Sequence, residues 1–187
     1  MHFEARHFVD WCIEQLGLGR LRGLKVLDVG SADINGNNRH YFGEGCQYTG
    51  CDVAPGPNVD IVCPCHLLPY LPELFDVIIS TECLEHDKHW EATVQKICEL
   101  LRPGGVFIMT CASTGRPEHG TKRCDADDSL TSGVEDPDWQ NYYRNLTAHD
   151  IASAIPVADI FPVHNFYFNP TSKDLYFYGI KALPGCV

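Results

Sequence analysis

Apolar residues along the first part of the chain follow two different spacings. Between residues 3 and 16 they recur every three or four positions and stop at Gly17, which predicts an amphipathic helix. Short continuous apolar runs then appear at 24–29, 48–53 and 75–80, each bounded by polar or glycine residues. Runs of this length and continuity are typical of strands that are buried on both faces of a parallel sheet.

The middle of the chain continues this alternation of strands and helices. Residues 59–62 form a short apolar run only five residues after the second strand, and a parallel crossover helix needs a dozen or more residues. We therefore expect a short or irregular third strand. Helical spacing over 90–101 predicts a helix that stops at 103–105 (Pro-Gly-Gly), followed by a fifth strand over 106–110.

The last third of the chain opens with a long stretch of low periodicity. Residues 112–141 are rich in Gly, Pro, Asp and Ser, and unstructured stretches of this length in compact domains are usually functional or disordered. Thr147 is then placed to cap a short helix. Alternating aromatic runs at 160–168 and 174–181 flank the turn residues 169–172, which predicts an antiparallel hairpin.

Composition and charge exclude several classes of partner. The 187 residues carry 25 acidic and 14 basic side chains, for a net charge of −11, which disfavours nucleic acids and anionic membranes. No apolar run approaches the ~18 residues of a membrane span, and the first residues lack the layout of a secretory signal. We expect a cytoplasmic protein, either a monomer or a homodimer.

Ten cysteines are too scattered to indicate a metal or disulfide framework. Cys98 and Cys111 sit inside apolar runs, where cysteine behaves as a small hydrophobic residue. Cys63 and Cys65 are separated by one residue and no matching Cys pair follows, so the spacing does not favour zinc. We expect reduced thiols.

Polar residues gather where the predicted strands end. Asp28 to Gly36 follow the first strand, Asp52 ends the second, and Ser80 to Asp87 follow the fourth. In open α/β sheets the carboxyl ends of parallel strands meet at one edge, and ligands bind there. The sequence therefore predicts a ligand site formed by these three segments.

The same segments carry a family resemblance. Val-Leu-Asp-Val-Gly, Tyr-Thr-Gly-Cys-Asp, Phe-Asp-Val-Ile-Ile-Ser-Thr-Glu-Cys-Leu-Glu-His and Leu-Leu-Arg-Pro-Gly-Gly occur in order over residues 24–111. Together they resemble the motifs of class I S-adenosylmethionine-dependent methyltransferases. Gly-Arg-Pro-Glu-His-Gly-Thr and Tyr-Tyr-Arg-Asn-Leu-Thr resemble, more narrowly, type 11-like methyltransferases of bacteria and phages.

This resemblance implies an α/β, Rossmann-like, doubly wound fold of three layers. Its mostly parallel sheet would end in an antiparallel C-terminal hairpin, in a single domain spanning residues 1–187. Within it we expect an N-terminal helix (1–20), a cofactor-binding core (24–111), a long substrate-side loop (112–146), and a C-terminal helix with the hairpin (147–187).

The resemblance also assigns cofactor contacts, with S-adenosylmethionine as cofactor and S-adenosylhomocysteine as product. Asp28 and the backbone of Gly30 and Ser31 would face the methionine part. Asp52, followed by Val53, would hold both ribose hydroxyls.

Further contacts follow from position. Asn35, Gly36 and Arg39 lie where the cofactor carboxylate could reach, and Arg39 would be its charge partner. Thr81, at the end of the fourth strand, would complete this side of the site.

The adenine end departs from the family pattern. Pro64 stands where the family usually carries an aspartate, so adenine recognition would rely on the backbone of Cys65 and His66. Leu67 would pack near the ring.

His86 and His119 are the candidate catalytic residues. If the acceptor is a hydroxyl, a general base accelerates transfer by roughly 10²–10⁴-fold, and histidine titrates near neutral pH. His86 follows the fourth strand, and His119 lies on the long loop.

Metal binding stays an alternative at this point, because Glu85, His86, Asp87 and His89 together could hold a divalent ion. A solvated helix start explains the same residues, and we expect no metal.

The predicted function is methyl transfer to the oxygen or nitrogen of a small-molecule or carbohydrate acceptor. A catalytically degenerate cofactor-binding protein is the alternative, because Ala32 and Ile34 replace two glycines of the family loop. A nicotinamide-dependent dehydrogenase is disfavoured, since the Gly-x-Gly-x-x-Gly pattern is missing and Asp33 would repel a pyrophosphate.

Overall fold

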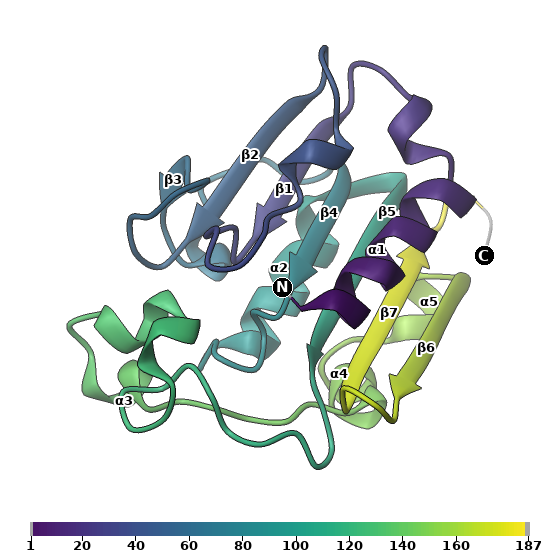
Figure 1. The fold of residues 1–187 in the computed structure, drawn as a ribbon. Helices are drawn as coiled ribbons and strands as arrows, with labels where there is room; N and C mark the ends of the chain where they lie inside the picture. The colour runs from purple at the N-terminus through teal and green to yellow at the C-terminus, as the bar shows by residue number, and fades with distance from the viewer. Residues whose placement is uncertain (1, 186–187) are drawn as a thin grey trace.

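Seven strands form one mixed sheet in the computed structural model, which describes residues 2–185 (Figure 1). The strand order is β3-β2-β1-β4-β5-β7-β6. The first five strands run parallel, whereas β7 is antiparallel to both β5 and β6. The strands are β1 (Lys25–Val29), β2 (Gln47–Asp52), β3 (Ile61–Val62), β4 (Phe75–Thr81), β5 (Leu101–Ala112), β6 (Val163–Asn169) and β7 (Asp174–Ile180).

Helices cover both faces of this sheet and complete three layers (Figure 1). Alternate residues of the strands point to opposite faces, so β1 sends Val26 toward α1 and Leu27 toward α2. α1 covers one face alone, and α2, α4 and α5 cover the other. The helices are α1 (Phe3–Gln15), α2 (Trp90–Leu100), α3 (Pro137–Gln140), α4 (Ala148–Ala154) and α5 (Val157–Ile160).

The predicted fold class is confirmed, with differences at the ends of elements. β3 has only two residues, as its short connection requires. β5 begins at Leu101, directly after α2, because residues 103–105 form a bulge within the strand instead of a turn before it. The strand expected from residue 160 begins at Val163, since α5 occupies the preceding positions.

Two connections decide the shape of the site. The crossover from β1 to β2 contains no α-helix, only one 3₁₀ turn (Arg39–Tyr41), so residues 30–38 form an open loop. The segment 112–141 is not structureless, because it contains α3 and two 3₁₀ turns. Figure 1 shows this segment, in green, below the carboxyl ends of the parallel strands.

Thr147 caps α4 as the sequence predicts. Its hydroxyl accepts a hydrogen bond from the Asp150 amide, and the Asp150 side chain accepts one from the Thr147 amide. The nine cysteines that the structure describes are all unpaired, and Cys186 lies outside the described residues. Within residues 2–185, no helix is both long enough and apolar enough to cross a membrane.

Candidate functional site

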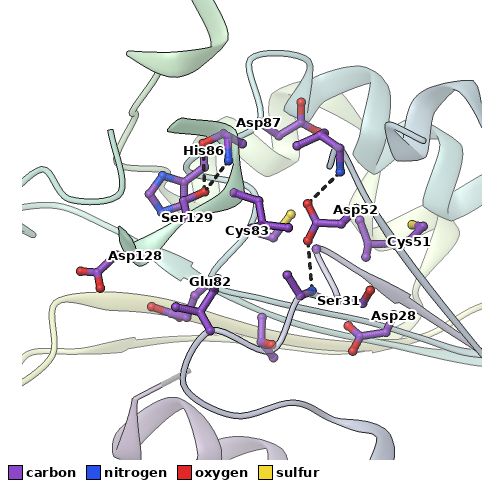
Figure 2. A pocket seen from close by; sticks show the side chains of 18 of the residues that line it. Asp28, Ser31, Cys51, Asp52, Glu82, Cys83, His86, Asp87, Asp128 and Ser129 are labelled. Carbon is purple, nitrogen blue, oxygen red and sulfur yellow. Dashed lines mark hydrogen bonds between the residues drawn. The ribbon is translucent and has the colours of Figure 1, made fainter. Parts of the chain in front are cut away.

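A cavity of about 1080 Å³, including its open mouth, lies beyond the carboxyl ends of β1, β2 and β4 (Figure 2). The residues that follow these three strands form its walls, and the segment 112–141 contributes Arg116, His119, Asp128, Ser129, Leu130, Thr131 and Trp139. The strand ends therefore meet where the sequence predicts a ligand site.

The turn after β1 depends on Gly30. Its φ of +76° lies in the left-handed region, and both the Gly30 and Ser31 amides donate to the Cys51 carbonyl, at 2.9 and 3.1 Å. A Cβ at Gly30 would lie 2.4 Å from the Cβ and Sγ of Cys83. Only glycine lets the backbone turn at this place.

Asp52 ends β2 with its carboxylate held by two backbone amides. Oδ2 accepts from the Ala32 amide at 3.1 Å and Oδ1 from the Val53 amide at 2.7 Å (dashed in Figure 2). Each oxygen keeps a second lone pair, and Asp52 lines the cavity. Burial raises the pKa of this carboxyl from its ordinary value.

Asp28 is more enclosed and already bound by side chains. Tyr48 donates its hydroxyl to Oδ2, and the Asn38 amide nitrogen lies 3.3 Å from both oxygens. Asn38 also donates to the Thr81 hydroxyl at 3.1 Å, which links the ends of β1 and β4. Burial outweighs these hydrogen bonds and raises the pKa of Asp28 to about 6.

Two histidines meet at the other end of the cavity. The rings of His86 and His119 lie 5.0 Å apart, edge to face, and the Tyr143 ring packs against both. Burial, assisted by nearby His119, lowers the pKa of His86 to about 3. Glu85 is completely buried beside them, and burial raises its pKa well above the ordinary value.

The long segment after β5 packs directly on His86. The Trp139 indole donates to the His86 carbonyl at 3.1 Å, and a Cβ at Gly120 would lie 2.6 Å from the His86 ring. Residues 112–141 thus form one wall of the cavity next to both histidines.

A third cluster joins distant parts of the chain. The Nε2 of His2 lies 2.7 Å from an oxygen of the buried Asp174 and 3.2 Å from one of Glu82. Burial opposes the charged imidazole, but these two carboxylates outweigh it and raise the pKa of His2 to about 10. Arg116 donates to the Ser172 carbonyl at 2.7 Å and lies 3.3 Å from Asp174. His2, Glu82 and Arg116 all line the cavity.

Most of the sequence-predicted residues lie around this one cavity. Its walls include Asp28, Gly30, Ser31, Asn35, Gly36, Asp52, Val53, Cys65, Thr81, His86 and His119. At the predicted adenine end the wall consists of residues 63–65, and His66 and Leu67 fall outside it. Leu67 is exposed, and the His66 ring packs against His89 instead.

Arg39 does not face the cavity, which corrects its expected role. Its Nε donates to the Asn58 side chain at 2.6 Å, and its Nη2 pairs with Asp60 at 2.6 Å. The guanidinium also lies over the Tyr48 ring, 4.3 Å from the centroid. These contacts tie the 3₁₀ turn to the connection before β3, away from the lining residues.

Sequence reasoning missed the contributions of His2, Asn38, Tyr48 and Trp139. Glu82 and Arg116 belong to motifs on which the family resemblance rests, but the sequence assigned neither of them a function. Glu82 carries one signal that only the structure reveals, a φ of +52° that is rare outside glycine and tends to occur at functional sites.

Comparison with known proteins agrees with this geometry. A family model described as a methyltransferase domain matches residues 3–153. No curated protein matches the sequence significantly.

Solved structures share the fold at low identity. The 1,6-didemethyltoxoflavin-N1-methyltransferase of Burkholderia thailandensis, solved with its substrate and S-adenosylhomocysteine, has a TM-score of 0.63 and 19% identity, covering 96% of this chain and 78% of that one. Phosphoethanolamine N-methyltransferase 2 of Haemonchus contortus, solved with phosphomonomethylethanolamine and S-adenosylhomocysteine, has a TM-score of 0.58 and 16% identity, covering 92% and 53%.

The cyclase SpnF also shares the fold, with a TM-score of 0.54 and 19% identity, covering 88% of this chain and 61% of that one. The fold therefore does not by itself determine the chemistry. The family match extends from the start of α1 into α4 and includes every strand end that forms the cavity. The chain belongs to the methyltransferase-domain family.

Proposed function

We propose that this protein transfers a methyl group from S-adenosylmethionine to the oxygen or nitrogen of a small-molecule or carbohydrate acceptor. The observation that carries the proposal is Asp52. Its carboxylate is fixed by the Ala32 and Val53 amides at the end of β2 and faces the cavity with two lone pairs left to accept hydrogen bonds. Two adjacent hydroxyls, as in a ribose, are the complementary donors.

The other lining residues fit the remaining parts of this cofactor. Asp28 and Glu82 place negative charge near the turn of Gly30, where a sulfonium and an amino group would be attracted. Arg116 provides a positive side chain for a carboxylate, in place of Arg39. Cys65 and Leu130 line the cavity with apolar atoms suited to a heteroaromatic ring.

The cofactor would supply the reactive methyl group already bonded to a sulfonium. The protein then has to orient the acceptor in line with that bond and exclude water, and positioning alone can lower a barrier substantially. His86 and His119 would contact the acceptor, and the rest of the segment 112–141 would shield them from water. The small-molecule acceptors bound in the Burkholderia and Haemonchus enzymes support the same acceptor class here.

The test is calorimetric titration of S-adenosylmethionine and S-adenosylhomocysteine into wild type and Asp52→Asn. Asparagine has one carbonyl oxygen and one NH₂ group in place of two carboxylate oxygens. It can therefore accept from only one of the two backbone amides, and one charged hydrogen bond from a ribose hydroxyl is lost. Such a bond contributes about 1.5–3 kcal/mol, which corresponds to a roughly 10–100-fold loss of affinity. The control is Glu44→Gln, which removes the same charge from an exposed position outside the cavity.

Absence of binding of either ligand to wild type would refute the proposal. Binding that depends on Asp52, without transfer to any acceptor of a broad amine and hydroxyl panel, would favour a catalytically degenerate cofactor-binding protein instead.

A further inference from the structure

Three side chains at the histidine end of the cavity bring potential metal ligands together. Glu85, His86 and His119 each offer one donor atom, and these atoms all lie within 4.8 Å of one another. Glu85 and His86 come from the segment after β4, and His119 comes from the long segment after β5, so the cluster is built by the fold and not by sequence proximity.

Two of these side chains are buried with polar atoms that have no partner. Oε1 of Glu85 accepts from the Ala112 amide at 3.0 Å, which fixes the carboxylate, but its Oε2 has no hydrogen-bond partner among the described residues. The Nδ1 of His86 is likewise buried and unpartnered. Native proteins rarely leave such atoms unsatisfied, and an ion that the structure does not contain is one established reason.

His119 is held in the tautomer that a ligand needs. Its Nδ1 lies 3.1 Å from the Pro117 carbonyl, which can only accept, so Nδ1 carries the proton and Nε2 keeps a lone pair. The Tyr143 hydroxyl donates to the same carbonyl at 3.0 Å. A backbone carbonyl that fixes the outer nitrogen of the ring is the common support of a metal-binding histidine.

A second cluster with suitable atoms, His2, Glu82 and Asp174, differs because its carboxylates already have positive partners. There the imidazole of His2 lies 3.2 Å from Glu82 and 2.7 Å from Asp174, and Arg116 lies 3.3 Å from Asp174, so two positive side chains balance the two carboxylates. Glu85 has no ion pair with any side chain in the described part of the protein. Of the two clusters, the one around Glu85 is therefore the one without a positive partner for its carboxyl group.

We propose that Glu85, His86 and His119 bind a first-row divalent transition-metal ion at the acceptor end of the cavity. One carboxylate oxygen and two imidazole nitrogens are the donors that such ions accept, whereas Mg²⁺ and Ca²⁺ take mainly oxygen. This replaces the expectation of no metal. Asp87 is occupied just before α2, accepting from the His89 amide and the Thr93 hydroxyl, and is not a ligand.

The site gives the proposed function a narrower acceptor class, and this step rests on that function. Three protein ligands leave open coordination positions, and His86 and His119 line the cavity. A Lewis acid lowers the pKa of a hydroxyl bound to it and orients that oxygen. A neutral amine already has its lone pair and gains nothing from this effect. The acceptor atom inferred from the metal site is therefore a hydroxyl oxygen.

The experiment is calorimetric titration of Mn²⁺ into the full chain after treatment with EDTA and dialysis. Mn²⁺ is the probe because the ten cysteines could bind Zn²⁺ at other places. We expect one site in wild type and at least a tenfold loss of affinity in both Glu85→Gln and His119→Ala. His89→Ala, which removes an exposed imidazole three residues from His86, should bind as wild type does.

Thermal melts of each variant separate lost ligands from lost folding, and His119 is the safer variant because it lies half-buried on a loop. The inference is overturned if wild type binds no Mn²⁺, or if folded Glu85→Gln and His119→Ala bind it as tightly as wild type. If the cofactor binds in a way that depends on Asp52 but no Mn²⁺ site is found, the metal-site inference is refuted and the proposed function stands. If a Mn²⁺ site is found but the cofactor does not bind, the proposed function is refuted, and the inference of a hydroxyl acceptor is refuted with it.

Discussion

Replacing Gly30 with alanine tests the turn on which the whole cavity depends. Two costs add at this position. A φ of +76° places an L-residue in the left-handed region, at about 1–2 kcal/mol. The new Cβ would also lie 2.4 Å from both Cβ and Sγ of Cys83, and overpacking of this kind typically costs about 1–3 kcal/mol. Gly30→Ala should therefore destabilise the fold by about 2–5 kcal/mol, out of a usual total of about 5–15 kcal/mol.

A matched control separates the two costs. Gly23 has a φ of +72° and nothing within 4 Å of an added Cβ, so Gly23→Ala should show the backbone cost alone. Combining Gly30→Ala with Cys83→Gly removes both crowding atoms. The double-mutant cycle should then recover the overpacking part, about 1–3 kcal/mol, but not the backbone part.

The assay is urea unfolding followed by circular dichroism, with equal m-values required before free energies are compared. The reasoning fails if Gly30→Ala costs no more than Gly23→Ala. It also fails if Cys83→Gly leaves the cost of Gly30→Ala unchanged, because the crowding would then lie elsewhere.

Three further predictions concern charged residues at and near the cavity. His2 has its pKa raised from 6.5 to about 10, so its contribution to stability is full below about pH 6.5 and disappears as the pH rises through 10. The difference in urea midpoint between wild type and His2→Gln should shrink between pH 6.5 and pH 10, and a difference that grows would contradict the assignment. Arg39→Ala should change stability by less than about 1 kcal/mol, as for exposed ion pairs, and cofactor affinity by no more than about twofold. Arg116→Ala should lower that affinity at least tenfold, and equal titration curves for the two variants would refute the exchange of roles.

The strands were predictable because burial on both faces leaves a continuous apolar run, and this signal is local. The start of β5 was not predictable, because Pro-Gly-Gly at residues 103–105 is compatible either with a turn before the strand or with a bulge inside it. A Cβ at Gly105 would lie 2.8 Å from the Arg102 carbonyl oxygen and 3.0 Å from that of Asp76, so glycine is required by the close approach of β4. The composition of a turn and that of a bulge are the same here, and only the neighbouring strand distinguishes them.

The residues of the site likewise differ in whether a local sequence pattern predicts their position. Asp28, Gly30 and Asp52 follow strands directly, so the strand pattern alone places them at one edge of the sheet. Arg39 lies ten positions after the end of β1, beyond the reach of that argument. The crossover contains no helix to fix its direction, and a long charged side chain pairs with the acidic group that the fold brings nearest, which is Asp60.

The cluster of His2, Glu82 and Asp174, with Arg116 beside it, has the opposite origin. His2 comes from the start of the chain, Glu82 from the end of β4, Arg116 from the segment after β5, and Asp174 from the start of β7. No spacing in the sequence connects these residues, since their contacts depend on α1 and β7 packing beside β5. Asp28, Gly30 and Asp52 follow a local pattern, whereas the contacts of this cluster depend on how distant segments meet. That difference explains why the family could be recognised from the sequence alone, while the meeting of His119 with Glu85 and His86, on which the proposed hydroxyl acceptor rests, appeared only in the structure.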